Sequence, residues 1–129
     1  MKSVDTNLLV RFVLQDDERQ ANIAREILAE HCFAPATVFL ELAWVVQSRG
    51  GADRKATART LHTLLELPTL AVERADQVRW AIDRFVEGAD LADMLHLIAS
   101  AQTDAFVTFD RSLARLAGRD TPVPVETLR

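Results

Sequence analysis

Apolar and polar positions follow two different periods along the chain. Short apolar runs, typical of buried strands, alternate with longer stretches in which apolar residues recur every three or four positions, as on one face of a helix. We predict strands at Lys2–Val4, Cys32–Ala34, Leu70–Val72, Ala105–Thr108 and, as an edge strand, near Val123–Glu126. We predict helices at Asn7–Leu14, Asp17–Glu30, Thr37–Gln47, Asp53–Leu65, Ala75–Phe85, Leu91–Gln102 and Arg111–Leu116.

Nearly all-apolar strands separated by helices indicate a doubly wound α/β fold, with a mostly parallel central sheet covered by helices on both faces. The 129 residues suffice for one hydrophobic core but not for two ordinary ones. With four Gly, four Pro and no linker-like stretch, we expect one domain over residues 1–129.

The composition narrows the class of protein. Hydrophobic residues make up 49% and charged residues 26%, as in ordinary globular proteins, and no apolar run could span a bilayer. The N-terminal residues lack the apolar run of a secretory signal, so we expect a cytoplasmic protein with no membrane partner. Cys32 is the only cysteine, and His31, His62 and His96 do not have zinc-like spacing, so neither a disulfide within the chain nor a zinc site is expected.

The net charge of −4 argues against nucleic-acid binding through a dense basic surface. Acids gathered around a metal ion would account for part of this excess, because the ion neutralises them. Basic side chains elsewhere would then remain free to meet phosphates.

Two carboxylates follow predicted strands directly. Asp5 follows the first strand and Asp110 the fourth. Ligands of open α/β sheets bind outside the carboxyl ends of the strands. Each acid also precedes a helix, however, where an N-terminal cap is an ordinary role for Asp.

Two more acids lie early in predicted helices. Glu41 has Val38 and Val45 three and four residues away, which predicts a position on an apolar stripe, although a glutamate at the rim of such a stripe is common. Asp93 lies in the first turn of a helix that Asp90 is expected to cap, where an acid complements the helix dipole. Each acid has an ordinary alternative, but a cluster of four is what Mg²⁺ or Mn²⁺ requires, and it would be repulsive without metal.

Five short segments, in this order, carry a resemblance over essentially the whole chain. They are Val4-Asp5-Thr6-Asn7, Phe39-Leu40-Glu41-Leu42, Ala92-Asp93-Met94-Leu95-His96, Thr108-Phe109-Asp110 and the closing Pro122–Leu128. The sequence resembles the PIN domain family and, within it, the VapC toxins of toxin–antitoxin pairs. The four acids Asp5, Glu41, Asp93 and Asp110 match the family's acidic positions.

The resemblance implies a single PIN-like domain in which the first and fourth strands are neighbours, with Asp5 and Asp110 side by side. It also implies Mg²⁺- or Mn²⁺-dependent endonucleolytic cleavage of RNA by a metal-activated water, a homodimer, and an antitoxin that covers the active site. Thr6, Asn7 and Thr108 are candidates for contacts around the metal or the phosphate, although turn and cap roles explain them equally well. Asp90 is either a cap alone or a further acid of the cluster.

Other functions stay open at this point. The chain could be an inactive PIN-like module that binds RNA or protein, a PIN nuclease that is not a toxin, or a nuclease that acts on DNA. The predicted helix with Phe39, Leu42, Trp44, Val45 and Val46 has more apolar circumference than one core face requires, which predicts that a partner covers part of it.

Overall fold

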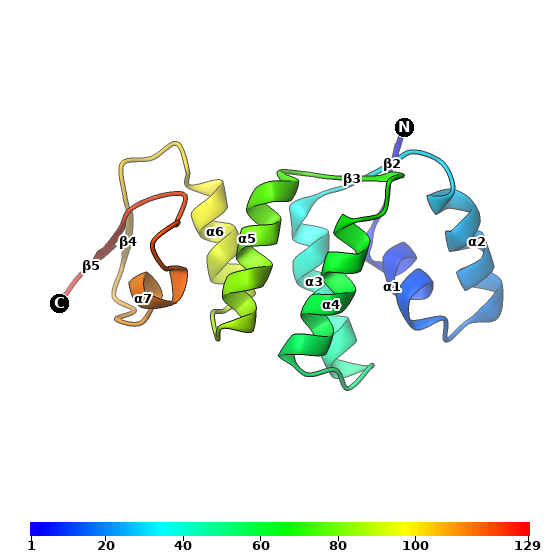
Figure 1. Ribbon diagram of the computed structural model, residues 1–129, viewed down its shortest axis with the longest axis horizontal. Helices are drawn as coiled ribbons and strands as arrows, with labels where there is room; N and C mark the ends of the chain where they lie inside the picture. Colours follow the sequence, from blue (N-terminus) through cyan, green and yellow to red (C-terminus); the bar gives the residue numbers. More distant parts are fainter. The chain divides into compact units, whose positions relative to one another are not determined.

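The chain forms seven helices and five strands, and the computed structural model describes residues 1–129 (Figure 1). These elements divide into two units, Met1–Ala75 and Asp76–Arg129. Each unit has a small parallel sheet of its own.

Unit 1 contains a three-stranded parallel sheet in the order β1-β2-β3. The register pairs Lys2 with Cys32 and Phe33 with Ala71. The strands are β1 (Lys2–Ser3), β2 (Cys32–Ala34) and β3 (Leu70–Val72), and the helices are α1 (Thr6–Leu14), α2 (Glu18–Leu28), α3 (Ala36–Ser48) and α4 (Arg54–Leu65). Helix α1 packs against α2 and α3, α3 packs against α4, and α4 contacts β3. The largest fully buried side chains of this unit are Leu9, Phe39, Leu42, Leu61 and Leu64.

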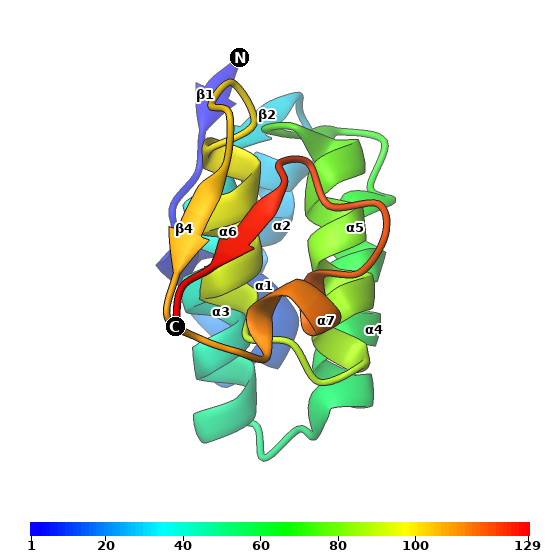
Figure 2. The ribbon, with the colours of Figure 1, turned by 90° about the vertical axis from the view of Figure 1, so that its left-hand side faces the viewer.

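Unit 2 contains the two-stranded parallel sheet β4-β5, whose strands lie side by side in Figure 2. Its elements are α5 (Ala75–Val86), α6 (Leu91–Ala99), β4 (Phe106–Thr108), α7 (Leu113–Ala117) and β5 (Val125–Thr127). The unit buries Val78, Ile82, Met94, Leu97 and Val123, and α7 contacts β5. The hydrophobic core of unit 2 therefore supports Asp90 and Asp93 at the start of α6 and the residues that follow β4.

Aspartates begin four of the helices in the same way. Asp5, Asp17, Asp53 and Asp90 have extended backbone, and each carboxylate accepts a hydrogen bond from the amide three residues later. This bond satisfies one of the amides that a helix N-terminus leaves unpaired. The capping role proposed for Asp5 and Asp90 is thus confirmed.

The structure confirms the predicted α/β class, the parallel strand pairing and the presence of every predicted element. Four boundaries differ by two or three residues: α2 ends at Leu28 rather than at Glu30, α6 ends at Ala99 rather than at Gln102, α7 begins at Leu113 rather than at Arg111, and β5 is Val125–Thr127 rather than Val123–Glu126. The strand pairings described above lie within the units, so the expected neighbouring of the first and fourth strands stays a prediction. No helix combines the length and the hydropathy that crossing a bilayer requires.

Candidate functional site

In unit 1 the two candidate acids are both solvent-exposed. Asp5 follows β1, and one of its oxygens, Oδ1, accepts from the Leu8 amide at 3.0 Å. Glu41 lies in the middle of α3. Val38 is buried but the Glu41 side chain is exposed, which agrees with the alternative of a glutamate at the rim of the apolar stripe, so the charge of Glu41 is not removed from water.

The start of α3 depends on an acid that the sequence analysis did not identify. Pro35 precedes α3 and offers no side-chain cap. Glu73 replaces the cap, because its Oε1 accepts from the Ala36 amide at 2.9 Å while its own amide donates to the Ala34 carbonyl oxygen at 3.0 Å. Glu73 directly follows β3, so its place at a strand end was the one available indication in the sequence. It fixes the helix that carries Glu41.

In unit 2 an acid pair opens α6. Asp90 caps the helix by accepting from the Asp93 amide at 3.0 Å, and Asp93 lies in the first turn, half-buried. Burial is the main cause that raises the pKa of the Asp93 carboxyl, and the negative charge of Asp90 raises it further. His96 lowers this pKa, and Asp110 raises it by a smaller amount. Asp93 therefore holds its charge at a cost that a cation would remove.

Asp110 lies in the turn after β4, not at the N-terminus of α7. Its Oδ1 accepts from the Ser112 hydroxyl at 2.7 Å and from the Ser112 amide at 2.9 Å. These two bonds lower the pKa of the Asp110 carboxyl, so the acid stays ionised. The Asp110 amide donates to the Thr108 hydroxyl at 2.9 Å, which gives Thr108 a turn-forming role.

The chemistry of the donor set in unit 2 fits a divalent cation. The carboxylates of Asp90 and Asp110 both raise the pKa of Asp93, and none of the three acids forms a salt bridge. Hard cations such as Mg²⁺ prefer such oxygen donors. Nowhere in the chain, however, are three or more His, Cys, Asp or Glu side chains gathered closely enough to hold a metal ion as they stand. Asp90 and Asp110 thus influence the charge of Asp93, but the three side chains do not form a complete set of metal ligands.

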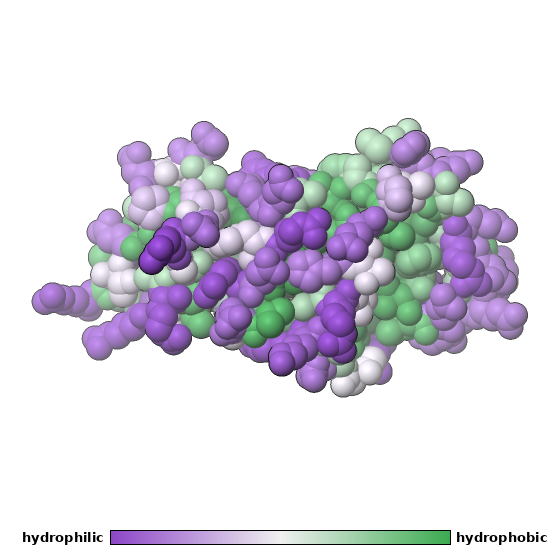
Figure 3. All heavy atoms as spheres, viewed as in Figure 1, coloured by the Kyte–Doolittle hydropathy of each residue, from purple (hydrophilic) through white to green (hydrophobic).

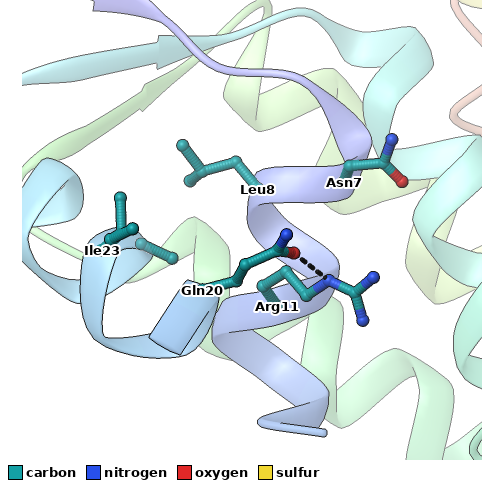
Figure 4. A pocket seen from close by; sticks show the side chains of 6 residues that line it. Asn7, Leu8, Arg11, Gln20 and Ile23 are labelled. Atoms are coloured by element: carbon teal, nitrogen blue, oxygen red, sulfur yellow. Dashed lines mark hydrogen bonds between the residues drawn. The ribbon is translucent and has the colours of Figure 1, made fainter. Parts of the chain in front are cut away.

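A pocket of about 180 Å³ lies between α1 and α2, without any of the four acids in its wall (Figure 4). Across one side, the Arg11 guanidinium donates through Nε to Gln20 Oε1 at 2.6 Å and forms a salt bridge with Asp16 at 2.9 Å. The remaining lining is mainly aliphatic and includes Leu8 and the part-exposed Ile23. Asn7 lines this pocket as well, one residue into α1.

Comparison with family models identifies the class of protein. The PIN domain model matches residues 2–119, and the chain therefore belongs to the PIN domain family. The PIN domain is in general a nuclease fold, and PIN nucleases generally use divalent metals such as Mg²⁺. Comparisons with curated proteins and with solved structures gave no match.

Proposed function

We propose that this protein is a Mg²⁺- or Mn²⁺-dependent endoribonuclease whose metal ligands are Asp5, Glu41, Asp93 and Asp110. The proposal rests on membership of the PIN family and on the presence of all four acids within the matched residues. The observation that carries it is the state of Asp93: half-buried, close enough to Asp90 and Asp110 to feel both charges, and in no salt bridge.

The side chains would divide the work by charge and position. Asp110 stays ionised through Ser112, and Asp93 gains most from a cation because burial and two acids oppose its charge. Asp5 and Glu41 are the exposed candidate acids of unit 1. A metal ion held by these acids would supply Lewis acidity, which would activate water for attack and neutralise charge at the phosphate. No side chain of the protein needs to form a covalent intermediate.

The test is cleavage of a labelled single-stranded RNA by the full chain in Mg²⁺, in Mn²⁺ and in EDTA. We expect internal cleavage with either metal, none in EDTA, and none by Asp93→Asn. A DNA oligonucleotide of the same sequence is the comparison substrate, because carboxylate–metal chemistry does not itself distinguish the sugar. Cleavage that persists in EDTA, or preference for the DNA, would refute the proposal.

We also propose that the enzyme acts in the cytoplasm as a VapC-type toxin, forms a homodimer and is held inactive by an antitoxin. Exposed apolar surface in unit 1 supports a protein partner. Trp44 is 64% exposed on α3, although its neighbours Leu42 and Val46 are buried. A hollow of about 270 Å³ between α1 and α4 is lined in part by Phe12, Val13 and Leu64, in the region where Figure 3 shows apolar side chains.

A further inference from the structure

The turn after β4 presents an exposed aromatic ring beside a candidate metal ligand. Phe109 is 72% exposed and directly precedes Asp110. A single exposed apolar residue is ordinary on a protein surface. An aromatic ring of this exposure is less so next to an acid at the carboxyl end of a strand, where ligands of α/β proteins bind.

Hydrogen bonds on both sides hold the backbone at Phe109. Before it, the Thr108 carbonyl oxygen accepts from the Leu128 amide at 2.8 Å. Across it, the Asp110 amide donates to the Thr108 hydroxyl at 2.9 Å, and after it Asp110 is bonded to Ser112. The ring is therefore presented from an ordered turn, and a ligand stacked on it would not have to order the loop first.

Three exposed arginines follow the ring at regular spacing. Arg111, Arg115 and Arg119 lie four residues apart, around the short helix α7, and none of them forms a salt bridge. No acid occurs between them in the sequence, although the whole chain has a net charge of −4. Residues 111–119 thus carry three positive charges and no negative one, between Asp110 and Asp120.

We propose that Phe109 is a stacking platform for one base of single-stranded RNA, and that Arg111, Arg115 and Arg119 bind the phosphates beside that base. Aromatic rings combined with a basic track are how proteins hold single strands without reading their sequence. Unstacked bases offer a free face to the ring, whereas a duplex does not. This inference rests on the proposed ribonuclease function and deepens it by assigning the residues that position the strand next to Asp110.

The test is fluorescence anisotropy of the full chain with a labelled single-stranded RNA of about 16 nucleotides, a length that covers such a site. Calcium alone is present, because it should support binding with poor turnover. Phe109→Ala and Phe109→Leu should each weaken binding about 5- to 100-fold, the effect of losing one stacked base, and Phe109→Trp should retain it. A plot of log affinity against log salt concentration has a negative slope, and Arg111→Gln and Arg115→Gln should each make it shallower by about 0.7.

Val107→Ala is the matched control, because Val107 is 53% exposed in the same strand but has no ring. Val107→Ala should leave the affinity for single-stranded RNA unchanged, and Phe109→Ala should leave the affinity for duplex RNA unchanged. Wild-type affinity in Phe109→Ala or Phe109→Leu would overturn the stacking role; if the wild type still cleaves RNA, the proposed function survives that result. A wild type that neither binds nor cleaves RNA would overturn both. A change in sedimentation of Phe109→Ala with unchanged RNA affinity would assign the ring to a protein contact instead.

Discussion

Two donors of Ser112, its hydroxyl and its amide, bond to the same oxygen of Asp110, at 2.7 and 2.9 Å. The bonds lower the pKa of Asp110, whereas burial and neighbouring acids raise the pKa of Asp93. Unit 2 thus keeps one candidate ligand ionised and pushes the other towards protonation. Both bonds use Oδ1, so Ser112 leaves Oδ2 of Asp110 for another ligand.

Ser112→Ala should raise the pKa of Asp110, because the hydroxyl bond is the main cause of its lowering. Acids with a lowered folded pKa stabilise the protein above their unfolded value, and this contribution is lost as pH falls through the folded value. As pH falls, Asp110 of the Ser112→Ala variant should become protonated at a higher pH than in the wild type, so its RNA cleavage should also be lost at a higher pH. NMR titration of the aspartate carboxyl carbons measures the shift. Ser100→Ala, which loses a bond to the His96 carbonyl oxygen instead, is the control and should leave the pKa of Asp110 unchanged.

Asp5→Asn separates the capping role of Asp5 from the proposed metal-binding role. Asn caps a helix about as well as Asp, so the fold should persist, with a melting temperature within about 2 °C of the wild type. Loss of the charge should lower RNA cleavage by about 100-fold or more if Asp5 binds metal. Asp17→Asn is the matched control, since Asp17 caps α2 with the same 3.0 Å bond, and it should cleave normally. Equal cleavage by the two variants would remove Asp5 from the ligand set.

Asp93→Asn should raise the melting temperature of the metal-free protein, because it removes a charge that burial, Asp90 and Asp110 all oppose. Metal that binds only the folded state stabilises it by about 2.7 kcal/mol at a hundredfold excess over Kd. Thermal melts with and without Mn²⁺ should show this rise in the wild type and a smaller one in Asp93→Asn. A destabilised variant with an unchanged metal response would mean that Asp93 serves only the helix.

The same variant has a defined pH signature. An acid with a raised folded pKa binds protons more readily when folded, so its unfavourable effect at neutral pH should fade as pH falls towards the raised value. As pH falls from neutral, the stability of the metal-free wild type should therefore rise relative to that of Asp93→Asn. Asp16→Asn provides the opposite sign: the Arg11 hydrogen bond lowers the pKa of Asp16, so the wild type should lose its advantage over this variant as pH falls. Parallel melts of the three proteins against pH check both signs.

Trp44→Ser should leave the monomer folded, because the indole is 64% exposed, but should weaken the proposed homodimer. Aromatic residues dominate the binding energy of many interfaces, and removal of one commonly costs about 2 kcal/mol or more, roughly thirtyfold in Kd. Analytical ultracentrifugation at micromolar concentration measures the change. Val107→Ser, in unit 2, should sediment as the wild type does. A wild type that remains monomeric would refute the dimer.

The sequence was sufficient for the elements and for the caps at Asp5 and Asp90, because both depend on neighbours within a few residues. The cap considered for Asp110 was wrong, since Ser112 precedes α7 instead. The predictions were incomplete where side-chain contacts in the folded protein determine the structure. The predicted start of α7 at Arg111 was wrong because the Asp110 carboxylate bonds to Ser112 and turns the backbone first. Helix α3 is apolar on several sides, so periodicity alone did not show which face of it is buried. In the structure Glu41 lies on an exposed part of α3. Glu73 was missed because its partner, Ala36, is 37 residues away in the sequence. Whether the four acids bind one metal remains a prediction.

The strands of unit 1 are neighbours in the order in which they are synthesised, and the last of them ends at Val72. Domains commonly fold from the N-terminus while the ribosome is still extending the chain. The sheet of unit 1 can therefore close, and Glu73 can cap α3, before Asp93 and Asp110 have emerged from the ribosome. A nascent chain at that stage exposes only Asp5 and Glu41 of the four proposed ligands, so RNA cleavage would have to wait until the last third of the chain has emerged.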